Sequence, residues 1–298
     1  MNRTVVTAIP SLPPAQIAAL AASYDRAIVR RRMRFAGGVI AFVLLLLLAA
    51  VGSEVSLTTF FAKLGNFTSY FYRILHLDSG AWVWTDFAEW FWGLKKWVVL
   101  IAETVLISYV GTIGGAFAAF LLNFLAARNV GPCLWLRIAV ARGFELCRTV
   151  PGIVFALIFV IAFGLGPMAG VFAIMIHTTG ALGKLYSEVV ENIDMKPVEG
   201  VRATGANWIT GIRFAVVPQV MASFASYTLL RFEINVREAS VMGFVGAGGV
   251  GQELLVAVRK FYYSDVSAIL ILIIVLVFAI DISTGFLRHR LIGMEHTR

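Results

Sequence analysis

Several apolar runs in this sequence are each about as long as a helix that crosses a lipid bilayer. The first covers residues 35–52, where leucine, valine and alanine dominate, and it ends before Glu54. A transmembrane helix needs roughly 20 mostly apolar residues. With 59% hydrophobic and only 14% charged residues, the chain is also too apolar for an ordinary soluble globule. The sequence therefore predicts a protein that resides in a membrane.

The apolar runs predict an all-α fold, a polytopic membrane bundle of about six transmembrane helices. The expected spans are residues 35–52, 97–126, 138–163, 168–182, 214–234 and 266–287. Pro151 and Gly152 interrupt the third span, and a tight turn over residues 164–167 leads into the fourth. Counts of five to seven spans stay open, because six spans place the basic residues between 63 and 96 on the outer side.

Basic residues set the expected orientation. Four arginines between residues 30 and 34 precede the first span, and cytoplasmic flanks carry an excess of Lys and Arg. Six crossings then place both termini in the cytoplasm. The expected organisation is a cytoplasmic tail over residues 1–34, a first transmembrane helix over 35–52, an extracytoplasmic or interfacial segment over 53–96, a core over 97–290 and a cytoplasmic tail over 291–298.

Residues 184–213 form a long polar, helix-forming stretch within the core, which we expect to be a cytoplasmic excursion. Inside it, residues 199–205 predict a short amphipathic helix that ends at the glycine break Gly205. Small residues would let this backbone enter a groove of another protein, while Glu199 and Arg202 form ion pairs at the rim. A second helix then leads to Pro218, which opens the next span, where its missing N–H costs least.

Ionisable residues within apolar segments are costly, so they are candidates for function. Glu145 with Arg148 and Glu233 with Arg237 have helical spacing, so each pair can neutralise itself on one helix face. Alternatively, the arginines line a path and attract an oxyanion, because a guanidinium matches phosphoryl oxygens in fork geometry. Hydroxyls and the histidine of the fourth span could donate to that anion or satisfy helix carbonyls. The translocation-path candidates are Arg148, His177, Thr178, Thr179, Arg231 and Arg237.

The glycine-rich motifs do not indicate a nucleotide site. Residues 180–184 lack the leading glycine and the final Ser or Thr of a P-loop. Residues 246–251 match the dinucleotide fingerprint but lie between two spans, without alternating strands and helices. A bend or re-entrant turn at the outer face fits better, because glycines allow positive φ and close helix contact in a dimer. The glycines of this predicted dimer or gate turn are Gly246, Gly248, Gly249 and Gly251.

We expect no catalytic residues, no resident metal and no nucleic-acid partner. The four histidines are scattered and include no HExxH motif. Cys133 and Cys147 lack the spacing of metal ligands. The net charge of +8 comes from basic residues at the ends of apolar runs and not from a basic, aromatic face.

The stretch over residues 197–206 resembles the cytoplasmic signature loop of ATP-binding-cassette importer permeases, in the form found in the phosphonate-transporter family. That loop reads Glu-Ala-Ala, followed at set spacings by Gly and Pro. Glu199, Gly205 and Pro218 match it, whereas Gly200 and Val201 replace the two alanines. Residues 163–170, 176–185 and 231–251 are also similar to the family, and the resemblance covers roughly residues 97–290.

The resemblance implies a type I importer fold with a coupling helix. It implies a homodimer in a bacterial cytoplasmic (inner) membrane, two ATPase subunits and an extracytoplasmic phosphonate-binding protein. ATP and Mg would bind the partner ATPase, so this chain would hold no cofactor. Its expected role is to move phosphonate, or a phosphite- or phosphate-like oxyanion, inward by alternating access. The implied ATPase-coupling residues are Glu199, Gly200, Arg202, Ala203, Thr204 and Gly205.

Two other functions stay open from the residues alone. A membrane-embedded enzyme would need a metal cluster or a nucleophile with its base. An ion-coupled secondary transporter of an anion would use midplane carboxylates such as Glu103 and Asp281, although the sequence shows no internal repeat. Dependence on ATP and on a partner ATPase separates the importer subunit from both.

Overall fold

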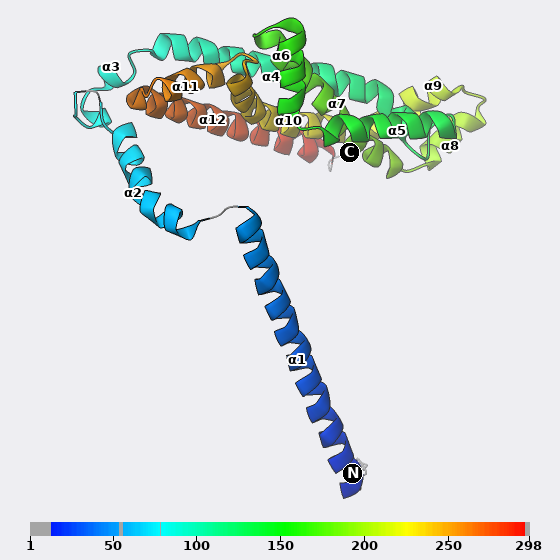
Figure 1. The fold of residues 1–298 in the computed structure, drawn as a ribbon. Helices are drawn as coiled ribbons and strands as arrows, with labels where there is room; N and C mark the ends of the chain where they lie inside the picture. The colour runs from blue at the N-terminus through cyan, green and yellow to red at the C-terminus, as the bar shows by residue number, and fades with distance from the viewer. Residues whose placement is uncertain (1–12, 54–55, 78, 296–298) are drawn as a thin grey trace, which may run out of the picture. The chain divides into compact units, whose positions relative to one another are not determined.

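A computed structural model describes residues 13–53, 56–77 and 79–295 of the chain. The chain divides into two compact units, residues 1–69 and residues 70–298. Within the described ranges every regular element is a helix (Figure 1). The predicted all-α fold is therefore confirmed.

The first unit is dominated by one long helix, α1 (Pro14–Gly52). Pro14 stands at its first position, where a missing N–H costs least. The apolar part, Tyr24–Gly52, is long enough to cross a membrane. Large side chains such as Phe42 and Leu45 are exposed along it, as expected of a helix surrounded by lipid. The next helix, α2 (Leu57–Ile74), begins in this unit and ends in the second.

The second unit is a bundle of long helices joined by short ones. In chain order its elements are η1 (Val83–Thr85), α3 (Phe87–Trp90), α4 (Leu94–Ala126), α5 (Leu134–Thr149), α6 (Gly152–Phe163), α7 (Pro167–Glu191), α8 (Lys196–Ala203), α9 (Trp208–Gly211), the π-helix η2 (Ile212–Val216), α10 (Val217–Met242), η3 (Gly243–Val245), α11 (Val250–Arg259) and α12 (Tyr263–Glu295).

The number of spans agrees with the prediction. Five helices among the described residues are long and apolar enough to cross a membrane, or six if α5 and α6 form one broken span. These two helices meet at an angle of 88°. The break falls at Pro151, which lacks an N–H and disfavours the helical conformation of the residue before it.

Several predicted span boundaries are wrong, and the fifth span continues to Val245 instead of ending at residue 234. Helix α7 continues to Glu191 instead of ending near Leu182, so the first part of the polar stretch extends the fourth span. The fifth span begins at Trp208, because α9 and the π-helix η2 run directly into α10. Pro218 does stand at an early position of α10. It does not open the span, because the π-helical turn before it shifts the backbone pairing and accommodates a residue that cannot donate.

Glycines bring α4 and α7 into close contact. A Cβ atom at Gly111 would lie 2.7 Å from Cγ2 of Ile174, and one at Gly115 would lie 2.7 Å from the carbonyl oxygen of Met175. Small residues are the usual means of bringing helix backbones together in lipid, where apolar side chains gain little by leaving the hydrocarbon. This pair therefore forms a closely packed centre of the bundle.

Three apolar cores hold the bundle together. One packs α4 and α6 against α7 and α10. In another, Tyr186 of α7 stacks on Phe224 of α10 with ring centroids 3.9 Å apart. The third joins the tryptophans around α3 to α11 and α12. There the Trp90 indole donates to Oγ of Ser267 at 3.0 Å, and the Trp92 indole donates to Oδ1 of Asp265 at 2.8 Å. Among the cores, α4, α7 and α10 carry buried polar side chains, which form the candidate site.

Candidate functional site

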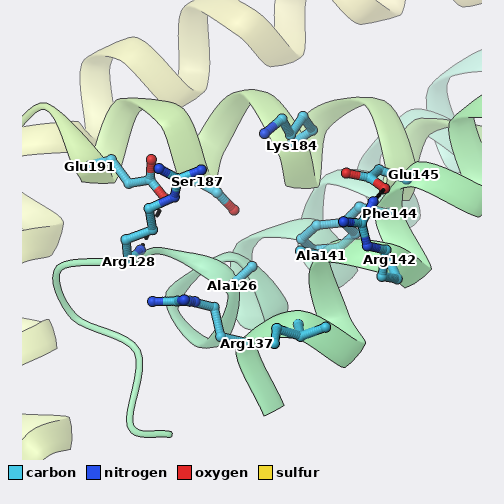
Figure 2. A pocket seen from close by; sticks show the side chains of 11 residues that line it. Ala126, Arg128, Arg137, Ala141, Arg142, Phe144, Glu145, Lys184, Ser187 and Glu191 are labelled. Carbon is cyan, nitrogen blue, oxygen red and sulfur yellow. Dashed lines mark hydrogen bonds and ion pairs between the residues drawn. The ribbon is translucent and has the colours of Figure 1, made fainter. Parts of the chain in front are cut away.

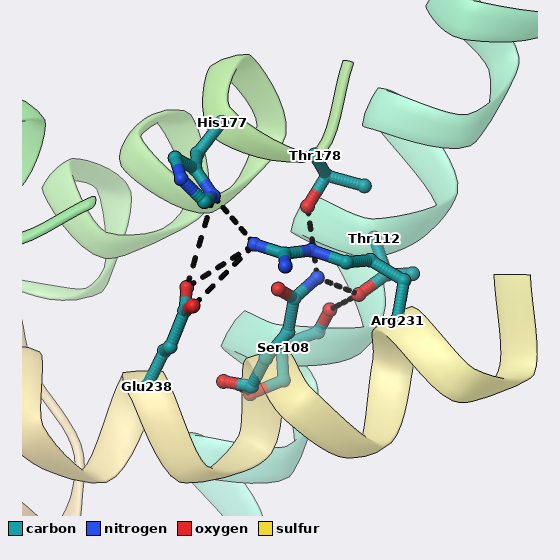
Figure 3. A network of polar contacts seen from close by, with 7 residues as sticks. Ser108, Thr112, His177, Thr178, Arg231 and Glu238 are labelled. Atoms are coloured by element: carbon teal, nitrogen blue, oxygen red, sulfur yellow. Dashed lines mark hydrogen bonds and ion pairs between the residues drawn. The ribbon is translucent and has the colours of Figure 1, made fainter. Parts of the chain in front are cut away.

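A charged cluster lies between α7 and α10 (Figure 3). Nη2 of Arg231 lies 2.5 Å from Nδ1 of His177 and 3.4 Å from both carboxylate oxygens of Glu238. The Arg231 and His177 side chains are only 12% and 14% exposed. Because the guanidinium can only donate, Nδ1 of His177 accepts and its proton resides on Nε2. The cluster thus presents a buried cation whose charge is balanced by one neighbouring carboxylate.

Asn235, one turn after Arg231 on α10, ties this helix to both of its neighbours. Its Nδ2 donates to Oγ1 of Thr112 on α4 at 2.7 Å and to Oγ1 of Thr178 on α7 at 2.9 Å. Ser108 of α4 donates to the Asn235 backbone carbonyl at 3.2 Å. Hydrogen bonds of this kind hold helices together in lipid, where an unpaired polar group is costly. Asn235 therefore fixes the position of Arg231 relative to α4 and α7.

A cavity of about 380 Å³ opens beside the charged cluster. It is lined by residues of α5 and α7, among them Arg148, Thr149, His177, Lys184 and Glu188. Two cationic side chains against one carboxylate give this lining a net positive charge. Since His177 contacts both the cavity and Arg231, an anion in the cavity would lie next to the cluster.

A second cavity, of about 500 Å³, continues along α7 toward the segment that precedes α8. It shares Leu185 and Glu188 with the first and reaches Asp194 and, on α10, Gln219 and Tyr227. Gln219 accepts from the backbone N–H of Asp194 at 3.2 Å, which ties α10 to this segment. Two cavities that share lining residues therefore lead from the charged cluster to the neighbourhood of α8.

The structure brings together only part of the predicted path. His177 and Arg231 lie in the cluster, Arg148 lines the cavity next to them, and Thr178 bonds Asn235. Thr179 instead donates to the Met175 carbonyl of its own helix at 2.8 Å.

The two predicted ion pairs have different outcomes. Arg237 pairs with Glu233, as its helical spacing predicts. The predicted pair between Arg148 and Glu145 is wrong, because Glu145 pairs with Arg142 on the preceding turn. A carboxylate in a helix has neighbours on both sides at this spacing, and spacing alone does not choose between them.

Sequence reasoning missed the polar partners of the cluster. Glu238 is one of the ionisable residues within apolar segments, and its spacing of two turns from Arg231 places both on one face of α10. Ser108, Thr112 and Asn235 were not singled out. The sequence indicates these residues only weakly, through small polar residues that recur on one face of otherwise apolar helices.

The coupling segment, Glu199–Gly205, is presented outward at one end of the bundle. All six predicted residues in it are exposed, while Val198 is buried and anchors α8 to the core of Tyr186 and Phe224. Gly205 ends the helix with a φ of 80°, as the predicted break requires. A Cβ atom at Gly200 or Gly205 would meet nothing within 4 Å. The segment thus offers an open surface with little side-chain bulk, and its docking role stays a prediction.

The glycine turn, residues 246–251, packs tightly against α4 and the start of α7. Gly246, Gly248 and Gly249 have the positive φ expected from the sequence. The backbone N–H of Val250 donates to Oγ1 of Thr104 at 2.9 Å, and that of Gly249 to Oε1 of Glu103 at 3.4 Å. The close contacts are made within one chain. A role for this turn in a dimer or gate stays a prediction.

Long apolar helices, a buried cation between them and adjoining cavities with charged lining residues are features of a membrane transport subunit. Comparison with known proteins identifies the family. Residues 111–293 match the family described as binding-protein-dependent transport system inner membrane component. This match covers more than half of the chain, which therefore belongs to that family and is a transport subunit, not an enzyme.

Three similar proteins show the range of relatives. The phosphite transport system permease protein PtxC of Stutzerimonas stutzeri is 39% identical over 199 residues, 66% of this chain and 72% of that protein. The putative cryptic phosphonate transport system permease protein PhnE2 of Escherichia coli is 52% identical over 120 residues, 40% of this chain and 98% of that protein. The phosphate-import permease protein PhnE of Mycolicibacterium smegmatis is 40% identical over 64% of this chain but only 36% of its own length.

Solved structures support the fold. The methionine transporter MetNI in an inward-facing conformation matches with a TM-score of 0.55 and 18% identity, covering 65% of this chain and 95% of that one. An amino acid ABC transporter matches with a TM-score of 0.54 and 15% identity over 67% and 98% of the two chains. The bundle is therefore the fold of importer permeases, and family membership favours an importer subunit over an ion-coupled secondary transporter.

Proposed function

We propose that this chain is the translocation subunit of an ATP-driven importer for a phosphorus oxyanion: a phosphonate, phosphite or phosphate. The names of the similar permeases support this substrate class. The observation that carries the proposal is the buried Arg231, held between His177 and Glu238 beside a net-positive cavity.

Arg231 suits transient binding of such an anion. A guanidinium donates to two oxygens at once in a geometry that phosphoryl groups match. Its buried Nε has no hydrogen-bond partner among the described residues, so a small movement of the side chain would offer this donor to cargo. Glu238 competes with the anion for the same cation and therefore weakens binding. Weak binding is what a path requires, because a deep energy well would prevent release.

Energy would come from subunits that dock on the coupling segment. ATP and Mg would bind there, not in this chain, and ATP would favour the state in which the docked subunits close. Two copies of this chain, two ATPase subunits and an extracytoplasmic binding protein would form the assembly. It would lie in a bacterial inner membrane with both termini of this chain in the cytoplasm.

Uptake of labelled methylphosphonate, phosphite and phosphate into proteoliposomes that contain the assembled transporter tests the proposal. We expect Arg231→Gln to lower uptake at least tenfold, and Arg231→Lys to lower it less, because lysine keeps the charge but loses the fork. Arg259→Gln, which removes an exposed arginine on α11, is the matched control and should transport normally. Uptake by Arg231→Gln at the native rate would contradict the proposed path, and uptake without any ATPase would replace the importer with a secondary transporter.

A further inference from the structure

We infer that a second cationic pocket, separate from the His177–Arg231 cluster, binds a phosphate group at the coupling end of the bundle. The pocket has a volume of about 250 Å³ and lies between the end of α4, α5 and α7 (Figure 2). Its charged lining residues are Arg128, Arg137, Arg142, Glu145, Lys184 and Glu191. This inference does not depend on which cargo the chain carries.

The carboxylates of the pocket neutralise only part of its positive charge. Arg142 pairs with Glu145, and Nε of Arg128 lies 3.8 Å from Oε1 of Glu191. The side chain of Arg137 has no hydrogen bond or ion pair within the described part of the chain. Lys184 pairs with Glu188 at 3.3 Å, so Arg137 is the lining cation that no carboxylate among the described residues neutralises. The pocket therefore has unused capacity for an anion.

The position of Arg137 favours a phosphate over a simpler anion. Arg137 lies in the first turn of α5, and that turn carries no acidic residue. Partial positive charge at the start of the helix adds to the guanidinium charge. Figure 2 shows Arg128 and Arg137 on one side of the pocket and Arg142 on another. Several oxygens of one tetrahedral group can accept from such separated donors, whereas a carboxylate has only two.

Two sources of phosphate can reach this pocket. Trp135 is 83% exposed and stands two residues before Arg137, and tryptophan prefers the headgroup level of a bilayer. The pocket therefore lies where either the headgroup phosphate of an anionic lipid or a free oxyanion in the water has access. Either ligand would link α5 to α7, the helix that leads to α8, so occupancy would stiffen the connection to the coupling segment.

The test compares two double variants of the full chain in lipid nanodiscs. Arg137→Gln with Arg142→Gln removes two charges from the pocket and leaves the cavity near His177 intact. Lys184 is left unchanged because it lines both cavities. Arg259→Gln with Lys260→Gln removes the same charge from exposed positions of α11 and the turn after it, and serves as the matched control. Size-exclusion chromatography establishes that each variant is folded.

Calorimetric titration in phosphatidylcholine nanodiscs measures the binding of free inorganic phosphate. Native mass spectrometry after reconstitution with phosphatidylglycerol measures how much of this anionic lipid the protein retains. We expect the pocket variant to weaken one of these ligands at least tenfold while the control binds like the native chain. Weaker phosphate binding by the pocket variant identifies the ligand of the pocket as a free oxyanion. Loss of retained phosphatidylglycerol identifies the ligand as a lipid headgroup. Unchanged binding of both ligands, or equal loss in the control, would overturn the inference. Uptake plays no part in either readout, so a failure here leaves the proposed cargo untouched.

Discussion

The coupling segment and the glycine turn both depend on glycines, but the surroundings of these glycines are opposite. In the turn, a Cβ atom at Gly251 would lie 1.8 Å from the carbonyl oxygen of Ser240, and one at Gly249 would lie 2.5 Å from Oγ1 of Thr104. In the coupling segment, a Cβ atom at Gly200 or Gly205 would meet nothing.

The difference separates two reasons for using glycine. In the turn, glycine allows parts of the same chain to approach closely, so it serves the fold. In the coupling segment, no described residue lies close enough to require a small side chain at Gly200. An exposed helix with little side-chain bulk can enter a groove of another protein. The comparison predicts that substitutions in the turn affect stability, whereas bulky substitutions in the coupling segment affect ATPase coupling.

Gly251→Ala should have the largest effect on stability. The new methyl group would overlap backbone atoms of Ser240, which cannot move without shifting α10. Such overpacking costs about 3 kcal/mol or more, which corresponds to a fall in Tm of roughly 10 °C for a chain of this size. Thermal unfolding in detergent, followed by tryptophan fluorescence, measures it. In a chain of this size, 1 kcal/mol shifts Tm by roughly 2–4 °C. A Tm within about 2 °C of the native value would therefore mean that the turn is not tightly packed.

Gly249→Ala and Gly205→Ala form a matched pair with an intermediate effect. Their φ values, 77° and 80°, are nearly equal, so each alanine adds backbone strain of about 1–2 kcal/mol. Only at Gly249 does the methyl group also displace the Thr104 hydroxyl that accepts from Val250, which leaves a buried donor unpaired at a further cost of about 1–3 kcal/mol. The fall in Tm should therefore be about twice as large for Gly249→Ala. Equal falls would show that strain alone matters.

Gly200→Ala should have the smallest effect. The residue lies within α8, where alanine is favoured over glycine by about 1 kcal/mol, and its methyl group would enter open space. Tm and ATPase coupling should both stay near native. Gly200→Trp tests whether another protein docks on this surface, because it should keep Tm near native and reduce stimulated ATP hydrolysis several-fold. Gly285→Trp, at an equally open glycine of α12, is its control. If both tryptophan variants lower hydrolysis alike, the loss does not come from a docking surface at Gly200.

Local patterns explain what the sequence could predict. The length of the apolar runs predicted the spans, Pro151 predicted the break between α5 and α6, and Gly205 predicted the end of α8. Each of these depends on one segment and its own backbone chemistry. The Glu233–Arg237 pair was predictable for the same reason, since both residues lie on one helix.

Contacts between helices explain what the sequence could not predict. The arrangement of Arg231 with His177, and of Asn235 with Thr112 and Thr178, depends on the rotation and depth of three separate helices. No periodicity within one helix contains that information. The π-helix before Pro218 was missed because it arises from how α9 joins α10, and not from a residue preference.

Whether this chain couples transport to ATP is measured by ATP hydrolysis in proteoliposomes that contain the chain, its candidate ATPase and a loaded or empty binding protein. We expect loaded binding protein to stimulate hydrolysis several-fold. The double variant Glu199→Ala with Arg202→Ala, at two exposed positions of the coupling segment, should abolish that stimulation while the chain stays folded and in the membrane. Full stimulation in the variant, or anion uptake by the native chain without any ATPase, would contradict the role of the coupling segment and with it the importer mechanism.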